Sequence, residues 1–589
     1  MNSKIFISLI FLSILSGTLP AQTKQISVYD KYEGMSSEKI YVGVNTTLLF
    51  TGEYLYYTVF CLDDKTKQPS KISSYAYLQL ISNDGTVIFQ HKVSLINSRG
   101  QGDFFVPTSI SSGVYKLIGY TKWMRNGRTE LFFQDDISII NPYQSNQTRI
   151  LKDKSSSIVQ NSITASGLKI QQDKRFVLEA DKNTYPKRTK VNLKLKNFRG
   201  PSGYGNYSLS VRRKSEFPNK FVDQNPISFI ESHSRATANE LPKYFNIEYL
   251  PETLGERISG KIVPRTEGTS VENKIVGISI PGTDFQLKAA VTDSEGEFHV
   301  DIFQNYTKPV IIAQMLEEGD KDAFKVELIH DPPLNLDNLK FKEFSMDSTM
   351  ESAILERSVS NQIENAYYQA RPDTLEIKER NDPYGGGEIE RYDLDDFTRF
   401  PTLIETMVEI LPYASIRKQG KDNFIFNVRL FDNYEGPQRS ALVFIDGMLI
   451  TSHKRIVEFD SKTISHISVV REKFELAGKN YRGMINIETF DKNYFEETSM
   501  ENIAYLEIMP PVKKKKYYHQ SYSQEEKEKY KRHPDNRYQL LWNPNVKLQG
   551  SEKSFDFYTS DIPGIYEITL EGFSIFGRPV FVSQTIEVR

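Results

Sequence analysis

Residues 441–490 hold the sequence pattern that most restricts how this chain can fold. An apolar run at residues 443–445 leads into the dipeptide Asp446-Gly447, a turn sequence whose glycine can adopt a positive φ. The chain then returns to apolar residues, so the pattern predicts two short strands joined by a tight turn. Two more strands are predicted after a polar passage, with Gly483 turning the chain into the second (residues 464–470 and 484–489).

A short helix is predicted just upstream, over residues 401–411, with Thr398 or Thr402 available to cap its N-terminus. Three apolar residues share one face of this helix (Leu403, Met407 and Ile410). We therefore expect the helix to pack on the sheet that follows it, which gives a small α/β domain over residues 391–495.

This α/β segment resembles the plug domain of TonB-dependent outer-membrane transporters. Plugs carry a V-x-I-D-G-x-x-I strand and turn, an I-x-x-I-x-V-x-R strand and a Y-G/R-G-x-I-x-I-x-T strand, which match residues 443–450, 464–471 and 481–489. A transporter continues from its plug into a barrel of roughly 22 strands, whereas only 99 residues follow residue 490 here. The resemblance thus implies a plug-like domain separated from its pore. An ordinary small α/β domain with the same strands and turns is the alternative.

Upstream of this domain, short strand-like segments rich in aromatic residues predict β-rich modules in a chain of 589 residues, too long for one core. The strings at residues 38–57, 102–107 and 112–126 resemble a macroglobulin-type domain of immunoglobulin fold. We predict such a β-sandwich over residues 30–141 and a second, shorter one over residues 168–248. The predicted fold class is mainly β, with several immunoglobulin-like sandwiches and one small α/β domain.

Two further modules are predicted from motif strings. The strings G-K-I-V, G-I-S-I-P-G and T-D-S-E-G-E-F within residues 249–332 resemble a carboxypeptidase regulatory-like domain, an accessory β-sandwich rather than an enzyme. Residues 537–589 resemble the closing β-sandwich of large envelope proteins that combine macroglobulin-type and plug-like modules. Residues 336–390 are predicted to be a charged helical linker, with a helix near residues 350–368, and residues 511–536 a charged, solvated linker.

The composition and motifs argue against several functions. Lys+Arg 74 against Asp+Glu 76 leaves no basic field for nucleic acid. The single cysteine, Cys61, rules out an intrachain disulfide, and its apolar surroundings predict a buried core residue. Covalent protease trapping by a macroglobulin needs a thioester cysteine in a G-C-G-E-Q context, which Cys61 does not have. We expect no cofactor, no metal site and no catalytic residues, and hence not an enzyme.

The N-terminus predicts export. Lys4 precedes an apolar stretch of about eleven residues, which is typical of a secretory signal and too short to span a bilayer. We expect residues 1–21 to be removed and the chain to reach the periplasm or the outer membrane of a Gram-negative cell.

These features favour a non-enzymatic binding or scaffold protein whose partner is an outer-membrane β-barrel protein. Two alternatives remain: an accessory or plug component of an outer-membrane transport or secretion machine, and a thioester-less macroglobulin-like protease-binding protein. In the favoured hypothesis the plug-like domain makes the contact, through Lys454, Lys473, Tyr481 and Arg482. Its structural turns are predicted at Asp446, Gly447 and Gly483.

Overall fold

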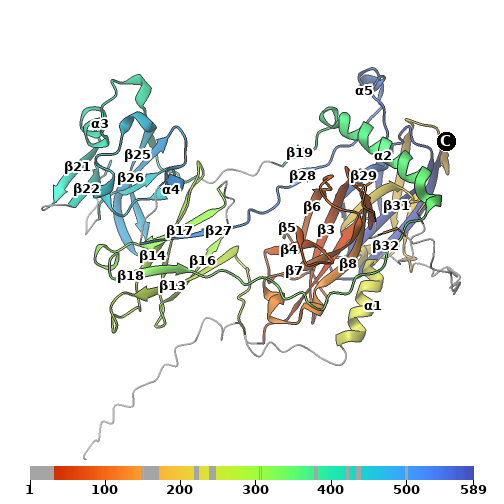
Figure 1. Cartoon of the computed structure of the whole chain (residues 1–589), viewed down its shortest axis with the longest axis horizontal. Coiled ribbons are helices and arrows are strands. Elements are labelled where there is room, and N and C mark those ends of the chain that lie inside the picture. Colours follow the sequence, from red (N-terminus) through yellow and green to blue (C-terminus); the bar gives the residue numbers. More distant parts are fainter. Residues whose placement is uncertain are drawn as a thin grey trace, which may run out of the picture.

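The computed structural model describes residues 32, 34–147, 150–151, 171–217, 224–237, 247–303, 306, 308–376, 382–419, 423–432, 439–497 and 502–589. The predicted signal peptide, residues 1–21, lies outside this part of the chain. Strands predominate and form several separate sheets, which confirms the predicted mainly β fold class. The elements gather in two lobes, with the ribbon of β19 (Thr374–Leu375) and β28 (Lys515–Lys516) between them (Figure 1).

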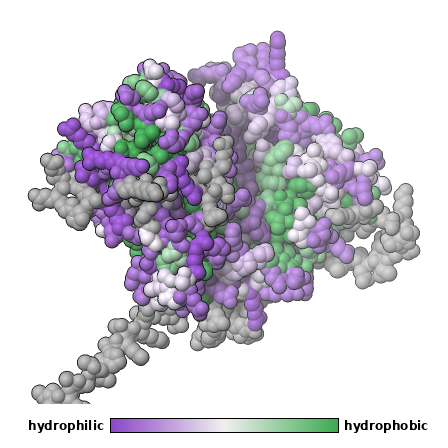
Figure 2. All heavy atoms as spheres, turned by 60° about the vertical axis from the view of Figure 1, so that its left-hand side comes forward, coloured by the Kyte–Doolittle hydropathy of each residue, from purple (hydrophilic) through white to green (hydrophobic). Residues whose placement is uncertain are grey.

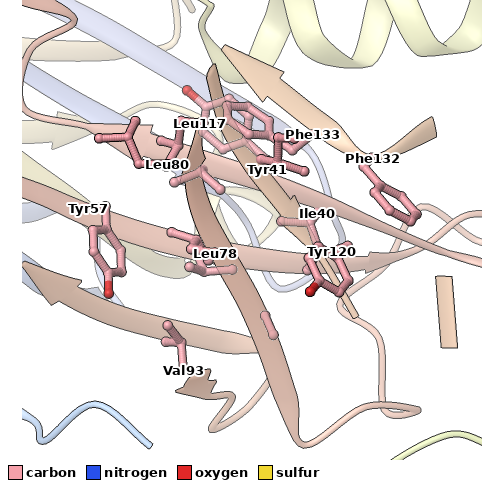
Figure 3. Packing of buried hydrophobic residues seen from close by; sticks show 14 of the residues in the cluster. Ile40, Tyr41, Tyr57, Leu78, Leu80, Val93, Leu117, Tyr120, Phe132 and Phe133 are labelled. Atoms are coloured by element: carbon pink, nitrogen blue, oxygen red, sulfur yellow. The ribbon is translucent and has the colours of Figure 1, made fainter. Parts of the chain in front are cut away.

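The first sandwich, in the right-hand lobe of Figure 1, is built from residues 38–140. One of its sheets has the order β1-β3-β6 and the other β2-β8-β7-β4-β5. Apolar side chains from both sheets fill the space between them, among them Ile40 and Tyr57 from one sheet and Leu78, Leu80 and Leu117 from the other (Figure 3). The strands are β1 (Glu38–Val44), β2 (Leu48–Phe50), β3 (Tyr54–Asp63), β4 (Tyr75–Ser82), β5 (Val87–Ser94), β6 (Arg99–Phe105), β7 (Gly113–Tyr120) and β8 (Phe133–Ile140).

The second sandwich is discontinuous in sequence. Its two sheets have the orders β30-β11-β9 and β10-β32-β31-β12-β29, so each sheet contains strands from residues 176–213 and from residues 539–588. Its members are β9 (Phe176–Ala180), β10 (Thr184–Tyr185), β11 (Lys190–Asn197), β12 (Gly205–Arg213), β29 (Gln539–Leu548), β30 (Glu552–Tyr558), β31 (Gly564–Phe573) and β32 (Pro579–Val588), with helix α1 (Pro226–Thr237) beside it. The modules predicted at residues 168–248 and 537–589 are therefore two halves of one domain, because β12 pairs on both sides with strands of the C-terminal half.

The third sandwich, in the left-hand lobe of Figure 1, also takes a strand from far downstream. Its sheets have the orders β16-β13-β18 and β15-β14-β17-β27. The strands are β13 (Glu256–Pro264), β14 (Ile275–Ile280), β15 (Gln286–Val291), β16 (Glu297–Ile302), β17 (Val310–Met315), β18 (Phe324–Leu328) and β27 (Ile503–Glu507). The predicted module at residues 249–332 lacks β27, which pairs with β17 along five residues.

The α/β domain contains a five-stranded sheet, β20-β25-β26-β23-β24, and a separate β21–β22 hairpin. Helix α3 (Leu403–Ile410) begins after Thr402, whose hydroxyl accepts a hydrogen bond from the backbone N–H of Glu405. Leu403 and Met407 on this helix are buried in the domain core, as the face predicted from the sequence requires. The strands are β20 (Ile389–Asp393), β21 (Ala414–Gln419), β22 (Asn423–Val428), β23 (Leu442–Ile445), β24 (Met448–Leu449), β25 (Ile464–Leu476) and β26 (Lys479–Thr489), followed by the short helix α4 (Tyr494–Glu497).

The domains are consequently nested. The α/β domain lies in sequence between β18 and β27 of the third sandwich, and the third sandwich lies between β12 and β29 of the second. The chain passes between the lobes several times, and two of these passes pair where Thr374 and Leu375 of β19 lie opposite Lys516 and Lys515 of β28. Each outer sandwich is therefore completed by strands that follow the inserted domain in the sequence.

The two predicted linkers are packed against the sandwiches rather than solvated. Helix α2 (Glu351–Ala366) agrees with the helix expected near residues 350–368, and its buried face is polar, with Arg357 and Asn361 turned toward the protein. In residues 511–536, which include helix α5 (Gln524–Tyr530), three tyrosines are buried (Tyr517, Tyr522 and Tyr530). The charge of these segments suggested exposure, but their aromatic and arginine side chains fill the junction of the first two sandwiches.

The first and second sandwiches are joined by buried polar contacts. Glu53 of the first accepts hydrogen bonds from Arg212 of the second at 3.0 Å and from Arg357 of α2 at 2.7 and 2.8 Å. Tyr41 donates a hydrogen bond of 2.8 Å to Glu571 across the same interface. Burial alone raises the pKa of Glu53, but Arg357 and Arg212 outweigh it and hold the pKa at about 2. Glu53 thus joins its own strand segment to two parts of the chain that are distant in sequence.

The first and third sandwiches meet at a second buried junction. Lys92 forms an ion pair of 2.5 Å with Glu256, and Tyr306 donates a 2.9 Å hydrogen bond to the same carboxylate. Glu252 lies nearby, where Tyr77 donates to both of its carboxylate oxygens at 3.0 Å. The pKa of Glu252 is raised to about 7, because burial and the nearby Glu256 raise it more than Lys122, Lys92 and the Tyr77 hydrogen bond lower it.

The raised pKa of Glu252 makes the junction pH-dependent. A carboxyl group whose pKa is higher in the folded state contributes stability below its unfolded pKa and loses it as the pH rises through the folded value. Between pH 4.5 and 7 this contribution falls by about 3 kcal/mol. We expect Glu252→Gln, which stays neutral, to remove this part of the pH dependence.

The measurement is the urea unfolding midpoint at about pH 5 and about pH 8. Wild type should lose more stability toward pH 8 than Glu252→Gln does. Glu248→Gln, at an exposed glutamate of the same segment, should behave like wild type. Identical pH profiles for wild type and Glu252→Gln would contradict the assignment.

Candidate functional site

The turn between β23 and β24 fixes one end of the α/β domain. Asp446 and Gly447 have φ angles of +50° and +81°, the geometry of the tight hairpin turn that Asp-Gly favours. The buried Asp446 carboxylate accepts hydrogen bonds from the backbone N–H and hydroxyl of Thr489, at 2.8 and 2.7 Å, and from the N–H of Tyr494 at 3.1 Å. Asp446 therefore also secures the end of β26, a role that the dipeptide motif did not reveal.

The same turn docks on the third sandwich. A Cβ atom placed on Gly447 would lie 2.5 Å from the Cβ of Phe285 and 2.9 Å from the backbone nitrogen of Gly282. The Gly282 N–H donates to the carbonyl of Asp446 at 3.2 Å, and the rings of Phe285 and Phe444 lie 4.7 Å apart. Gly447 is thus required both for the turn and for the close approach of two domains.

Gly483 marks an irregularity in the β25–β26 pairing. Its φ is +77°, and a Cβ there would lie 2.6 Å from the carbonyl oxygen of Val470 and 2.7 Å from the Cβ of Val428. The register shifts between Val470 and Lys473 at this point, which is the arrangement of a β-bulge. The bulge separates the part of the two strands inside the sheet from the part that extends beyond it.

Residues 471–482 form a two-stranded extension, here named the arm. β20 pairs with β25 only up to Val470, and β23 pairs with β26 only from Met484, so the arm lies beyond both flanking strands. Lys473 and Arg482 are direct partners across the arm and both are exposed. Two side chains of like charge thus face each other on the exposed side of the arm.

Tyr481 is not on the same face as these cations. Its side chain is only 8% exposed and packs in a cluster with Phe285, Phe444 and Met484. Strand alternation explains the difference, because Tyr481 and Phe474 point toward the third sandwich while Lys473 and Arg482 point away. Tyr481 is therefore buried between the α/β domain and the third sandwich, and its predicted contact with a partner stays a prediction.

Lys454 lies on a different element, the single-turn helix His453–Arg455 that follows β24. It is exposed but is not part of the arm. Beside that turn, a cavity of about 420 Å³ opens between the α/β domain and the third sandwich. Arg439 lines it and forms a 2.8 Å ion pair with Glu317, which links the two domains at its rim.

The single cysteine of the chain lies in the core of the first sandwich. Cys61 is buried, and its pKa is raised by burial and by Glu38, which keeps the thiol protonated. Among the described residues, no group of three or more His, Cys, Asp or Glu side chains is placed to hold a metal ion. In the same residues no helix is both long and apolar enough to cross a membrane.

The surface of the α/β domain and its neighbours is mostly hydrophilic, with apolar side chains gathered in a few places on each lobe (Figure 2). On the α/β domain the exposed large apolar residues are Ile389, Phe397, Val408, Phe431 and Phe490. They come from several elements and include none of the residues predicted from the sequence to contact a partner.

Comparison with known proteins finds only solved structures of low sequence identity. No family model and no curated protein matches the sequence. Among solved structures, Salmonella α-2-macroglobulin reacted with methylamine is 8% identical, with a TM-score of 0.23, over 94% of this chain and 40% of that one. Escherichia coli α-2-macroglobulin activated by porcine elastase is 8% identical, with a TM-score of 0.24, over 94% of this chain and 44% of that one.

The Escherichia coli adhesin FdeC is 13% identical over 29% of this chain and 45% of that one, with a TM-score of 0.14. The chain therefore spans less than half the length of each of these structures. These TM-scores do not establish a common arrangement of domains. The plug-like and carboxypeptidase regulatory-like resemblances have no counterpart among these structures and stay predictions.

Proposed function

We propose that this protein is a non-enzymatic binding and scaffold protein of the cell envelope that presents its α/β domain to an outer-membrane β-barrel partner. The exposed face of the arm, with Lys473 opposite Arg482, is the observation that carries this proposal. The arm is supported on its other face by the third sandwich, so it is held in place before any partner arrives. Ordering a binding element in advance lowers the entropic cost of association.

Nesting supports the same function. The α/β domain is inserted between β18 and β27 of the third sandwich. The buried Lys92–Glu256 ion pair joins the third sandwich to the first. The sandwiches can thus set the position of the arm relative to the rest of the protein. The plug-like sequence pattern supports the choice of a β-barrel protein as partner, and the apolar N-terminal stretch supports export.

The test is photocrosslinking in intact cells, with a photoreactive residue placed singly at Lys473, Arg482, Lys454 or Lys513. We expect Lys473 and Arg482 to give adducts with the same outer-membrane β-barrel protein, because they face the same way across the arm. Lys513, which is exposed in the segment between the lobes, is the matched negative control. Lys454 reports whether the contact extends beyond the arm.

A second measurement uses Lys473→Glu/Arg482→Glu, which should abolish the adduct formed from a probe at the neighbouring Glu475 without changing the unfolding midpoint. Adducts at Lys513 equal to those on the arm, or no adduct from a probe at Lys473 or Arg482, would refute the proposal. The same holds if the captured protein is not a β-barrel.

A further inference from the structure

A cavity of about 160 Å³ lies at the junction of the first and second sandwiches. Its walls come from β3, β12, β29, helix α2 and residues 517–518, which are brought together by the nested topology. One water molecule needs about 10–15 Å³ of such volume, so the cavity has room for roughly ten waters. That space is comparable with a single sugar ring.

Four aromatic rings form a row along this cavity. Tyr368 and Tyr54 lie 6.1 Å apart with 17° between their planes, and Tyr54 and Tyr56 lie 5.6 Å apart with 13° between theirs. Tyr56 and Trp542 continue the row at 5.9 Å and 22°. The three pairs are stacked, with nearly parallel planes. The π face of an exposed aromatic ring is negative and attracts the slightly positive C–H groups of a sugar face.

Each of the three guanidinium groups of the cavity has a carboxylate counter-ion. Three guanidinium groups and three carboxylates line it, so the lining has no net charge (Arg212, Arg371 and Arg537; Glu53, Glu364 and Asp373). Arg212 pairs with Glu53 at 3.0 Å and Arg371 with Glu364 at 2.8 Å, while Arg537 bonds to the neighbouring Asp535 at 2.6 Å. An anionic or cationic ligand would compete with these pairs, so the cavity favours a neutral ligand.

Unsatisfied polar groups in the wall favour a ligand rich in oxygen. Among the described residues, Nε1 of Trp542, Nδ2 of Asn361 and Nε of Arg371 are buried donors without a hydrogen-bond partner. All three residues line the cavity and each is more than nine-tenths buried. Leaving such donors unpaired is unfavourable, and hydroxyl or ring oxygens are the acceptors that would pair with them.

We propose that this cavity binds a neutral carbohydrate, one ring of which stacks on Tyr368 at the exposed end of the aromatic row while its oxygens accept hydrogen bonds from the cavity wall. The site is independent of the arm and of any outer-membrane partner. It gives the scaffold a second ligand of a different chemical class.

The experiment titrates the full-length protein with maltotriose, cellotriose and chitotriose, and with choline and inorganic phosphate as charged probes. Binding is followed by calorimetry and by tryptophan fluorescence, since the chain has only two tryptophans and Trp123 is fully buried elsewhere. We expect saturable binding of at least one trisaccharide, a fluorescence shift that is lost in Trp542→Phe, and no binding of choline or phosphate.

Tyr368→Ala should weaken this binding at least tenfold, because the ring stacks on the sugar, whereas Tyr368→Phe should bind like wild type. Tyr368 is 41% exposed, so its removal should leave the fold intact, and Tyr505→Ala, at a comparably exposed tyrosine in β27, is the matched control. No saturable binding of any trisaccharide up to roughly 10 mM would overturn the proposal. Binding that persists in Tyr368→Ala, or preference for choline or phosphate, would overturn it equally.

Discussion

Replacing Glu53 with alanine is expected to lower the free energy of unfolding by about 4 kcal/mol, because it leaves two buried guanidinium groups without their counter-ion. Arg212 and Arg357 converge on this carboxylate from the second sandwich and from α2, and the backbone N–H of Phe50 donates to it at 3.2 Å. All three side chains are nearly inaccessible to water. The change should appear as a lower urea midpoint and as earlier proteolysis of α2, which Arg357 joins to this carboxylate.

The matched control is Glu356→Ala, one residue from Arg357 on the same helix. Glu356 pairs with Arg213 at 3.0 Å but is about half exposed, so its loss should cost under about 1 kcal/mol. The pKa of about 2 adds a pH signature: stability from Glu53 is complete above the usual carboxyl pKa of 4.5 and is lost as the pH falls through about 2. Equal destabilisation by the two substitutions would show that burial of the ion pair is irrelevant.

Gly447→Val is expected to destabilise the α/β domain by about 3 kcal/mol and to loosen it from the third sandwich. Two effects combine, since the residue has a φ of +81° and its Cβ would fall within 3 Å of Phe285 and Gly282. Limited proteolysis should cut between the third sandwich and the α/β domain faster in the variant, and its unfolding midpoint should fall.

Gly478→Val separates these two effects. Gly478 in the arm has a similar φ of +70°, but a Cβ there meets nothing within 4 Å. It should show the backbone strain alone, about 1–2 kcal/mol, and no change in proteolysis between the domains. Equal effects of the two substitutions would mean that the Gly447 turn does not dock on the third sandwich.

Local features of the fold could be predicted from the sequence because they depend on neighbouring residues. The Asp446-Gly447 turn, the capping of α3 by Thr402 and the burial of Cys61 each follow from a few adjacent residue types. Strand pairing over long distances could not be predicted. Alternating apolar residues in β12 show that it is a strand with one buried face but contain no information about which strands lie beside it.

For the candidate site, the strands could be predicted from the sequence but the burial of their side chains could not. The sequence predicts a turn at Gly483, whereas β26 runs through this residue with a bulge. Lys473 and Arg482, whose pairing the motif did not indicate, lie opposite each other across the arm. Tyr481 belongs to the same sequence motif, but its side chain is buried against the third sandwich. The sequence did not indicate that the third sandwich lies there. The row of tyrosine and tryptophan rings could not be predicted from the sequence. Tyr54, Tyr368 and Trp542 come from three segments that are brought together only by the tertiary fold.

The nesting of the domains also orders events in time. β12 ends at Arg213 and its partner β29 begins at Gln539, so the second sandwich cannot close until more than 320 further residues have been synthesised. At a synthesis rate of about 5–20 residues per second, the first half waits for roughly 15 to 65 seconds. The innermost domain can form first, the third sandwich after β27 emerges, and the second sandwich last. Throughout that interval both edges of β12 lack their partner strands, β29 and β31. Unpaired strand edges promote aggregation, so the nascent chain is most prone to aggregate at the second sandwich.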